Sequence, residues 1–324
     1  MKAIVYERYG SPDVLKLAEV EPPAPATNEI LIKIHAVEAT KADCEMRSFR
    51  FAVKWFWLPL RLAFGIRKPR NKILGAYFAG EVESVPQTCS RLKVGDKVFG
   101  ASKLKLGAYG EYLSLPDNYA IEKMPANMSF EEAAASLLGG WNALHFIDKV
   151  KLKAGESILI NGAGGSIGLF AIQIAKSIGA KVTAVDKASK HDVLKTAGAN
   201  RIIDYQEQSF ADSDERYDVV FDMVASSSYS SCISVLNPKG RYAKGNPRLL
   251  DLLRSLVTPR LSGKEVVVAF AGETIQELAT LKEMIEAGKI RSIIDSTFSM
   301  EQAAAAHRKV ETEKRNGAIV ISIP

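Results

Sequence analysis

Apolar and polar positions alternate along several short segments in the first third of the chain. Residues 29–37 (EILIKIHAV) alternate with a period of two, which is typical of a strand with one buried face. Similar short segments are residues 2–6, 14–20, 79–85, 97–99 and 111–115. Many short strands separated by turn signals such as Gly95-Asp96 predict a small β-barrel.

The middle of the chain has a different pattern. Ser129 and Glu132 form a capping-box signal that predicts the start of a helix. After it, apolar runs alternate with helical patterns. The predicted strands are 157–161, 181–185, 201–204, 218–222 and 265–269, and the predicted helices are 166–179, 188–198 and 228–236. This order predicts a parallel sheet covered on both faces. The tail predicts a helix over 274–287, a strand over 290–294, a helix over 299–311 and a strand over 317–323.

The most informative segment joins the apolar run 157–161 to the helical pattern that follows it. Its turn reads GAGGSIG from Gly162 to Gly168. Glycines let a backbone turn tightly and approach a pyrophosphate, and the N–H groups of the helix start favour an anion. A second strand ends in Asp186, 18 residues after Gly168, where a carboxylate can accept hydrogen bonds from ribose hydroxyls. A glycine cluster alone is also typical of an ordinary tight turn, but the whole pattern predicts dinucleotide binding.

The residues after Asp186 leave the kind of dinucleotide open. A carboxylate repels a 2′-phosphate and so favours NAD(H). Lys187, Lys190 and His191 follow at once, and Lys190 has the charge to pair with that phosphate. Taken singly, each of these cations also fits a solvated helix start.

Charge and cysteine content limit the class of protein. The net charge is +6, from 43 basic and 37 acidic residues. The excess lies in one basic insert, residues 49–72, which contains no acid, so the pattern does not indicate a nucleic-acid-binding protein. Three distant cysteines and the absence of a signal-peptide pattern predict a cytoplasmic protein without disulfides. The cations of the basic insert are Arg50, Lys54, Arg61, Arg67, Lys68, Arg70 and Lys72.

Several ordered motifs together indicate a family. The chain resembles the medium-chain dehydrogenase/reductase superfamily and, within it, the zinc-free quinone oxidoreductase-like branch. The motifs are 74–85 (LGAYFAGEVESV), 93–100 (KVGDKVFG), 107–112 (GAYGEY), the glycine turn, 198–205 (GANRIIDY), 217–222 (YDVVFD) and 317–321 (GAIVI). The resemblance implies an α/β protein in which a GroES-like β-barrel catalytic domain (1–122 and 266–324) encloses a doubly wound Rossmann domain (123–265). It also implies an active site in the cleft between the two domains and a homodimer.

The resemblance also bears on metal chemistry. Zinc alcohol dehydrogenases of this superfamily hold their catalytic zinc with a Cys–His–Cys set. By local register these positions fall on Thr40, Ala76 and about Gly139, and none of these residues binds zinc as those ligands do. We therefore expect no zinc. Without a metal, the easier reaction is hydride transfer to an electron-poor carbon of a lipophilic quinone or α,β-unsaturated carbonyl.

Candidate site residues follow from the turn and the resemblance. Thr40, Asp43, Tyr77 and Asn142 are the catalytic candidates: Thr40 as a hydrogen-bond donor to substrate, Tyr77 as a proton donor or simply a core aromatic, and Asn142 near the nicotinamide. In NADPH-dependent relatives a lysine and a tyrosine at the positions of Lys190 and Tyr205 meet the 2′-phosphate. We expect NADPH, with NADH as the alternative. The cofactor-binding candidates are Gly162, Gly164, Gly165, Ser166, Ile167, Gly168, Asp186, Lys190, Tyr205 and Gly245.

The basic insert also carries six aromatic residues between positions 49 and 64. On a helical wheel Arg47, Arg50, Lys54 and Arg61 share one face, as in a helix at an anionic lipid surface, although Pro59 interrupts a continuous helix. Three interpretations remain open: a cover over the cleft, a wall of an apolar substrate pocket, and weak membrane-surface contact. The insert also supports an alternative function, a nucleotide-binding scaffold or membrane-associated partner protein with little turnover.

Overall fold

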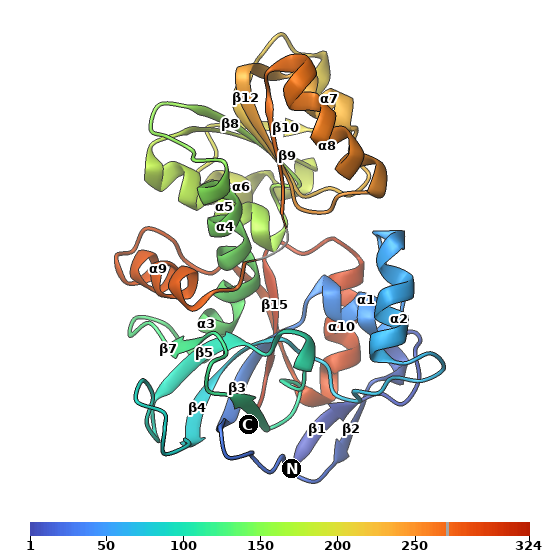
Figure 1. Ribbon diagram of the computed structural model, residues 1–324, viewed down its shortest axis with the longest axis vertical. Coiled ribbons are helices and arrows are strands. Elements are labelled where there is room, and N and C mark those ends of the chain that lie inside the picture. The colour runs from blue at the N-terminus through green and yellow to red at the C-terminus, as the bar shows by residue number, and fades with distance from the viewer. Residues whose placement is uncertain (270–271) are drawn as a thin grey trace. The chain divides into compact units, whose positions relative to one another are not determined.

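The computed structural model describes residues 1–269 and 272–324 and divides the chain into two compact units (Figure 1). The split unit comprises residues 1–51, 56–138 and 273–324. The parallel-sheet unit comprises residues 52–55 and 139–272. The resemblance led us to expect domain boundaries at 122/123 and 265/266, whereas the two compact units divide at 138/139 and 272/273.

The split unit is built from both ends of the chain. Its main sheet has the order β14-β15-β3-β4-β5-β7, and β6 also pairs with β3. The C-terminal strand β15 (Ala318–Ser322) runs antiparallel to the N-terminal strand β3 (Glu29–Glu38). A separate hairpin joins β1 (Lys2–Val5) to β2 (Lys16–Glu19). The other strands are β4 (Tyr77–Ser84), β5 (Lys97–Ala101), β6 (Tyr112–Pro116), β7 (Ile121–Lys123) and β14 (Ile294–Ser299).

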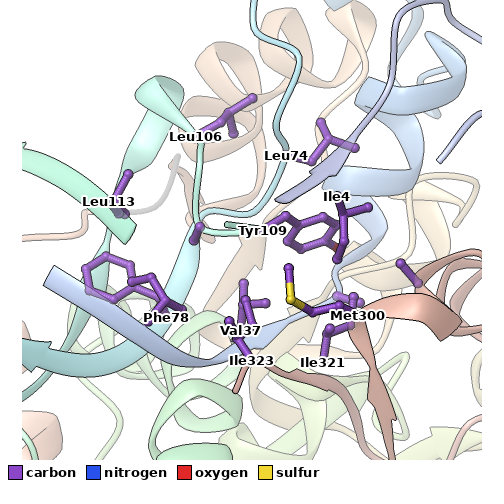
Figure 2. Close-up of a cluster of buried hydrophobic side chains, with 14 of the residues drawn as sticks. Ile4, Val37, Leu74, Phe78, Leu106, Tyr109, Leu113, Met300, Ile321 and Ile323 are labelled. Carbon is purple, nitrogen blue, oxygen red and sulfur yellow. The ribbon is translucent and has the colours of Figure 1, made fainter. Parts of the chain in front are cut away.

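The core of the split unit draws its apolar side chains from segments far apart in sequence. Figure 2 shows Ile4, Val37, Phe78 and Tyr109 gathered with Ile321 from the other end of the chain. Each of these side chains is almost completely buried. Burial of apolar area therefore fastens the two ends of the chain into one unit.

Helices cover this sheet, and one of them explains why the split unit extends to residue 138. Helix α3 (Phe130–Ser136) packs on β3, β4 and β15 and so belongs to the split unit. Its predicted capping box is confirmed, because Ser129 Oγ accepts the Glu132 N–H and the Glu132 carboxylate accepts the Ser129 N–H. The other helices of this unit are α1 (Lys41–Ser48), α2 (Trp57–Phe64), α9 (Ile275–Glu286) and α10 (Ala303–Glu311).

The parallel-sheet unit has six strands in the order β10-β9-β8-β11-β12-β13, and every neighbouring pair is parallel. This is the strand order of the doubly wound Rossmann fold, which reverses between its first and fourth strands, here β8 and β11. The strands are β8 (Ser157–Asn161), β9 (Lys181–Asp186), β10 (Arg201–Asp204), β11 (Tyr217–Asp222), β12 (Leu236–Lys244) and β13 (Glu265–Val268). The helices are α4 (Asn142–Lys149), α5 (Ser166–Ile178), α6 (His191–Ala197), α7 (Tyr229–Ser234) and α8 (Leu249–Ser262).

Some sequence-based predictions were wrong. The helix predicted over 228–236 is present as α7 but ends at Ser234. The strand β12 was not predicted; it begins at Leu236 and pairs with β11 and β13. The strand predicted over 290–294 is also wrong: β14 begins at Ile294, where pairing with β15 starts. These segments take their structure from a strand elsewhere in the chain, which local periodicity does not reveal.

The prediction that Arg47, Arg50, Lys54 and Arg61 share one helical face is also wrong. Helix α1 ends at Ser48, and Phe49 has a φ of +54°, which breaks the helical path. Arg47 and Arg61 therefore lie on two separate helices. Pro59 lies inside the first turn of α2, where a missing N–H costs no intrahelical hydrogen bond. Among the described residues, no helix has the length and apolar content that a membrane span requires.

Candidate functional site

The glycine turn follows β8 and leads directly into α5. Gly162 has a φ of +80°, a conformation that favours glycine, and its N–H and that of Ala163 both donate to the Val185 carbonyl at 3.1 Å. The Gly165 N–H donates back to the Gly162 carbonyl at 3.2 Å, which closes the turn. The backbone is thus held in a tight reversal between β8 and α5.

Two glycines of this turn leave no room for a side chain. A Cβ at Gly168 would lie 2.5 Å from the Ala163 carbonyl oxygen, so only glycine lets α5 come this close. A Cβ at Gly164 would collide with the Lys190 side chain and lie 2.9 Å from the Asp186 carboxylate. The N-cap residue of α5 is Gly165, which has no side chain to cap the helix. A helix N-terminus that follows a tight glycine turn is a common binding site for anions.

Asp186 and Lys190 meet beside the turn. The Asp186 carboxylate accepts the Gly164 N–H at 2.8 Å and the Lys187 N–H at 2.9 Å. Lys190 Nζ lies 3.7 Å from this carboxylate and donates to the Gly164 carbonyl at 3.2 Å. Tyr205 follows β10, is about half exposed, and donates its N–H to the Asp186 carbonyl at 3.4 Å. The structure thus brings together the residues that the sequence assigned to the ribose and 2′-phosphate.

A buried polar cluster lies at the ends of β11 and β12, and the sequence analysis did not identify it. Lys244 Nζ lies 3.0 Å from the Asp222 carboxylate and 3.8 Å from that of Asp251, and all three side chains are buried. Tyr242 also donates to Asp222, at 2.8 Å, and Asn161 Nδ2 donates to it at 3.0 Å. The sequence contained one signal for this cluster, because β11 ends in the acid Asp222 and β12 ends in the cation Lys244.

The loops after β11 and β12 are tied to the end of β8. The Met223 N–H donates to the Asn161 carbonyl at 3.2 Å, and Asn246 Nδ2 donates to the Met223 carbonyl at 2.9 Å. Gly245, predicted to approach the cofactor, packs so closely on Met223 that a Cβ would lie 2.5 Å from its sulfur. Asn142, the predicted nicotinamide neighbour, is buried at the start of α4 in this same unit.

The catalytic candidates Thr40 and Asp43 form a buried pair in the split unit. The Thr40 hydroxyl donates to Asp43 Oδ2 at 2.5 Å and accepts the Asp43 N–H at 3.1 Å. Asp43 Oδ1 accepts the Gly75 N–H at 3.1 Å. Burial raises the pKa of Asp43, and these hydrogen bonds oppose that effect. The pair caps α1 and fastens it to the segment before β4, so the Thr40 hydroxyl proton already has an acceptor.

Tyr77, the other candidate in this unit, pairs with a residue that the sequence analysis did not identify. Its hydroxyl donates to Glu273 Oε1 at 2.5 Å. Burial, and then the charge of Glu273, raise the pKa of Tyr77 well above its usual value. Loss of the phenolic proton would place two negative charges side by side. The arrangement therefore favours a neutral Tyr77 that donates hydrogen bonds over one that gives up its proton.

Metal-binding residue types are dispersed. Among the residues that the structure describes, no three His, Cys, Asp or Glu side chains are grouped so that they could hold a metal ion.

His307, in the split unit, is buried and accepts a hydrogen bond from Arg47 at Nδ1, at 3.2 Å, while Nε2 lies 2.9 Å from the Tyr109 hydroxyl. Arginine only donates, so His307 is neutral with its proton on Nε2.

A Rossmann sheet with a glycine turn, joined to a unit built from both chain ends, defines a two-domain dinucleotide-binding oxidoreductase. Two family models match the chain: "Alcohol dehydrogenase GroES-like domain" over residues 26–126 and "Zinc-binding dehydrogenase" over residues 197–321. The chain belongs to the medium-chain dehydrogenase/reductase superfamily, in its quinone oxidoreductase-like branch.

Three similar proteins illustrate this assignment. A 2-methylene-furan-3-one reductase from Solanum lycopersicum is 32% identical over 99% of this chain and 79% of its own length. A quinone oxidoreductase from Homo sapiens is 29% identical over 96% of this chain and 94% of its own. The solved structure of the quinone oxidoreductase from Coxiella burnetii superposes with a TM-score of 0.87 at 26% identity, covering 100% of this chain and 99% of that one.

Proposed function

We propose that the protein is an NADPH-dependent reductase that transfers hydride to a quinone or an α,β-unsaturated carbonyl without zinc. The observation that carries this proposal is the glycine turn with the Asp186–Lys190 pair beside it. Relatives named as quinone oxidoreductases, and an NADPH-dependent alkenal/one oxidoreductase from Arabidopsis thaliana that is 30% identical, support the acceptor class.

The proposal assigns each part of the cofactor to residues of the parallel-sheet unit. The start of α5, from Ser166 through Ile167 to Gly168, would hold the diphosphate, because a helix N-terminus carries a positive partial charge that favours an anion. Asp186 would accept a hydrogen bond from the ribose. Gly245 and Asn142 would border the nicotinamide, which when bound supplies the hydride.

The preference for NADPH follows from charge. An isolated carboxylate at Asp186 would repel a 2′-phosphate, but here the Lys190 ammonium lies 3.7 Å away and offsets that charge. The exposed ring of Tyr205 follows the neighbouring strand and is available to a phosphate at this edge. Lys190 and Tyr205 would together bind the 2′-phosphate.

In the split unit the proposal assigns substrate orientation to Tyr77 and a supporting role to the Thr40–Asp43 pair. Hydride addition leaves negative charge on the substrate oxygen, which a neutral hydroxyl donor stabilises. Tyr77 is such a donor when its bond to Glu273 is exchanged for one to substrate. The positions that carry catalytic zinc ligands in zinc relatives are Thr40, Ala76 and about Gly139 here, so the proposed reaction uses no zinc.

We also propose a cytoplasmic homodimer, on the resemblance alone, and keep one alternative function. A low-turnover scaffold or membrane-surface protein is favoured by the exposed apolar side chains of α2, such as Trp57, Leu58 and Leu62. Co-sedimentation of the protein with anionic vesicles, with and without the substitution of these three residues by serine, tests that alternative.

The deciding experiment follows NADPH and NADH consumption at the nicotinamide absorbance against a panel of quinones and enones. We expect turnover with NADPH that survives dialysis against a strong chelator. Tight cofactor binding without turnover on any acceptor would favour the scaffold. Activity that chelation removes and zinc restores would contradict the zinc-free mechanism.

A further inference from the structure

One piece of the basic insert packs apart from the rest of it. Residues Ala52–Trp55 belong to the parallel-sheet unit, although the chain on both sides belongs to the split unit. Val53 is buried, and the Trp55 indole N–H donates to the Pro247 carbonyl at 3.3 Å. The segment Ala52–Trp55 is therefore anchored, within the parallel-sheet unit, on the loop that follows β12.

The strand order places the loop after β12 last among four neighbouring loops at the carboxyl ends of the parallel strands. Asp186 ends β9, the glycine turn follows β8, Met223 follows β11, and Gly245–Pro247 follows β12. These strands are neighbours in the order β9-β8-β11-β12, and all are parallel, so their carboxyl ends share one edge of the sheet. A dinucleotide with its ribose at Asp186 and its diphosphate at the glycine turn extends along this edge toward the loops after β11 and β12. Trp55 contacts the loop after β12, where the nicotinamide of such a dinucleotide would meet the hydride acceptor.

We propose that Trp55 is a specificity-determining residue whose indole ring forms one wall of the acceptor site and selects flat conjugated rings. Trp55 is 37% exposed, so part of its ring surface is open to a ligand, while the bond to Pro247 holds the ring in place. An electron-rich indole stacks well on an electron-poor ring such as that of a quinone. This inference rests on the proposed function for the orientation of the cofactor.

A kinetic comparison tests the selection. Trp55→Leu keeps an apolar side chain but removes the flat ring, and Trp57→Leu is the matched control because Trp57 is also exposed and lies two residues away in the split unit. We expect Trp55→Leu to raise KM for a bicyclic quinone about tenfold, which corresponds to about 1.4 kcal/mol, and to change KM for a small linear enone less than about twofold. Trp55→Phe should restore most of the loss. Equal changes for both acceptors, or no change, would overturn the proposal.

A binding measurement separates this inference from the proposed function. Trp57→Phe leaves Trp55 and the buried Trp141 as the indoles, and Trp55→Phe leaves Trp57 and Trp141. We expect a bicyclic quinone, added with oxidised cofactor, to quench fluorescence with saturation only in the protein that retains Trp55. Saturable quenching without turnover would support the Trp55 site and refute the proposed function. Turnover with quenching that is linear in quinone for both proteins would refute the Trp55 site alone.

Discussion

The ammonium of Lys190 and the carboxylate of Asp186 lie 3.7 Å apart, and both side chains are more than nine-tenths buried. The carboxylate also accepts the Gly164 N–H, and the ammonium donates to the Gly164 carbonyl. The pair therefore links the end of β9 to the glycine turn. An acid that by itself would favour NADH thus becomes part of a site with little net charge.

The first prediction concerns this pair. Lys190→Ala should weaken NADPH binding about tenfold or more and NADH binding about twofold, because the variant loses a cation and leaves the Asp186 charge facing the 2′-phosphate. Calorimetric titration of both cofactors measures this ratio. Lys187→Ala serves as the control, since that residue is the neighbouring lysine outside the pair. Equal weakening of the two cofactors by Lys190→Ala would show that this residue does not read the phosphate.

A second prediction concerns the close approach in the glycine turn. Gly168→Ala should lower the free energy of unfolding by about 1–3 kcal/mol, because its Cβ would lie 2.5 Å from the Ala163 carbonyl oxygen. Gly165→Ala is the control, since its Cβ would lie 3.5 Å from the nearest atom, the Gly162 carbonyl oxygen. Urea denaturation without cofactor compares the two variants. Similar stabilities would contradict the steric account.

A third prediction addresses the buried cluster of Asp222, Lys244 and Asp251. Lys244→Met should destabilise the protein by about 3–5 kcal/mol, because two buried carboxylates would lose their shared cation. The double variant Lys244→Met with Asp222→Asn should recover part of this loss. Urea denaturation again gives the values. If the double variant is no more stable than Lys244→Met, the Asp222 charge is not the cause.

A fourth prediction concerns acid stability. Burial, and then the charge of Arg47, lower the pKa of His307 to about 3, from 6.5 in the unfolded chain. Above pH 6.5 neither state binds the proton, so His307 carries no penalty there. Below pH 6.5 the unfolded chain takes up a proton that the folded protein refuses, and stability falls by up to about 1.4 kcal/mol per pH unit toward pH 3.

His307→Gln removes this titration and retains an amide that can donate to Tyr109. The free energy of unfolding of the variant should therefore change less between pH 6.5 and 4.5 than that of the original protein. The comparison uses the difference between the two proteins, because carboxylates common to both also titrate in acid. Parallel curves would rule out His307 as a source of acid sensitivity.

Local sequence determined the elements whose chemistry is contained within a few residues. The glycine turn, the capping box at Ser129 and the acid at the end of β9 were all visible in sequence, because each depends on short-range backbone geometry. The order of strands and helices likewise predicted a parallel sheet, since five of its six strands carry their own apolar run. The motifs implied that both ends of the chain form one unit.

Tertiary structure decided which side chains meet. Asp222 and Lys244 are 22 residues apart, and Tyr77 and Glu273 are 196 apart, and no local pattern relates them. The strand β12 formed where β11 and β13 supplied partners. Helix α1 ends at Ser48, before the basic insert, and α2 begins at Trp57, while Ala52–Trp55 between them packs in the parallel-sheet unit. Hydrogen bonds and ion pairs between distant segments depend on how the chain packs, so their partners exist only once the fold has formed.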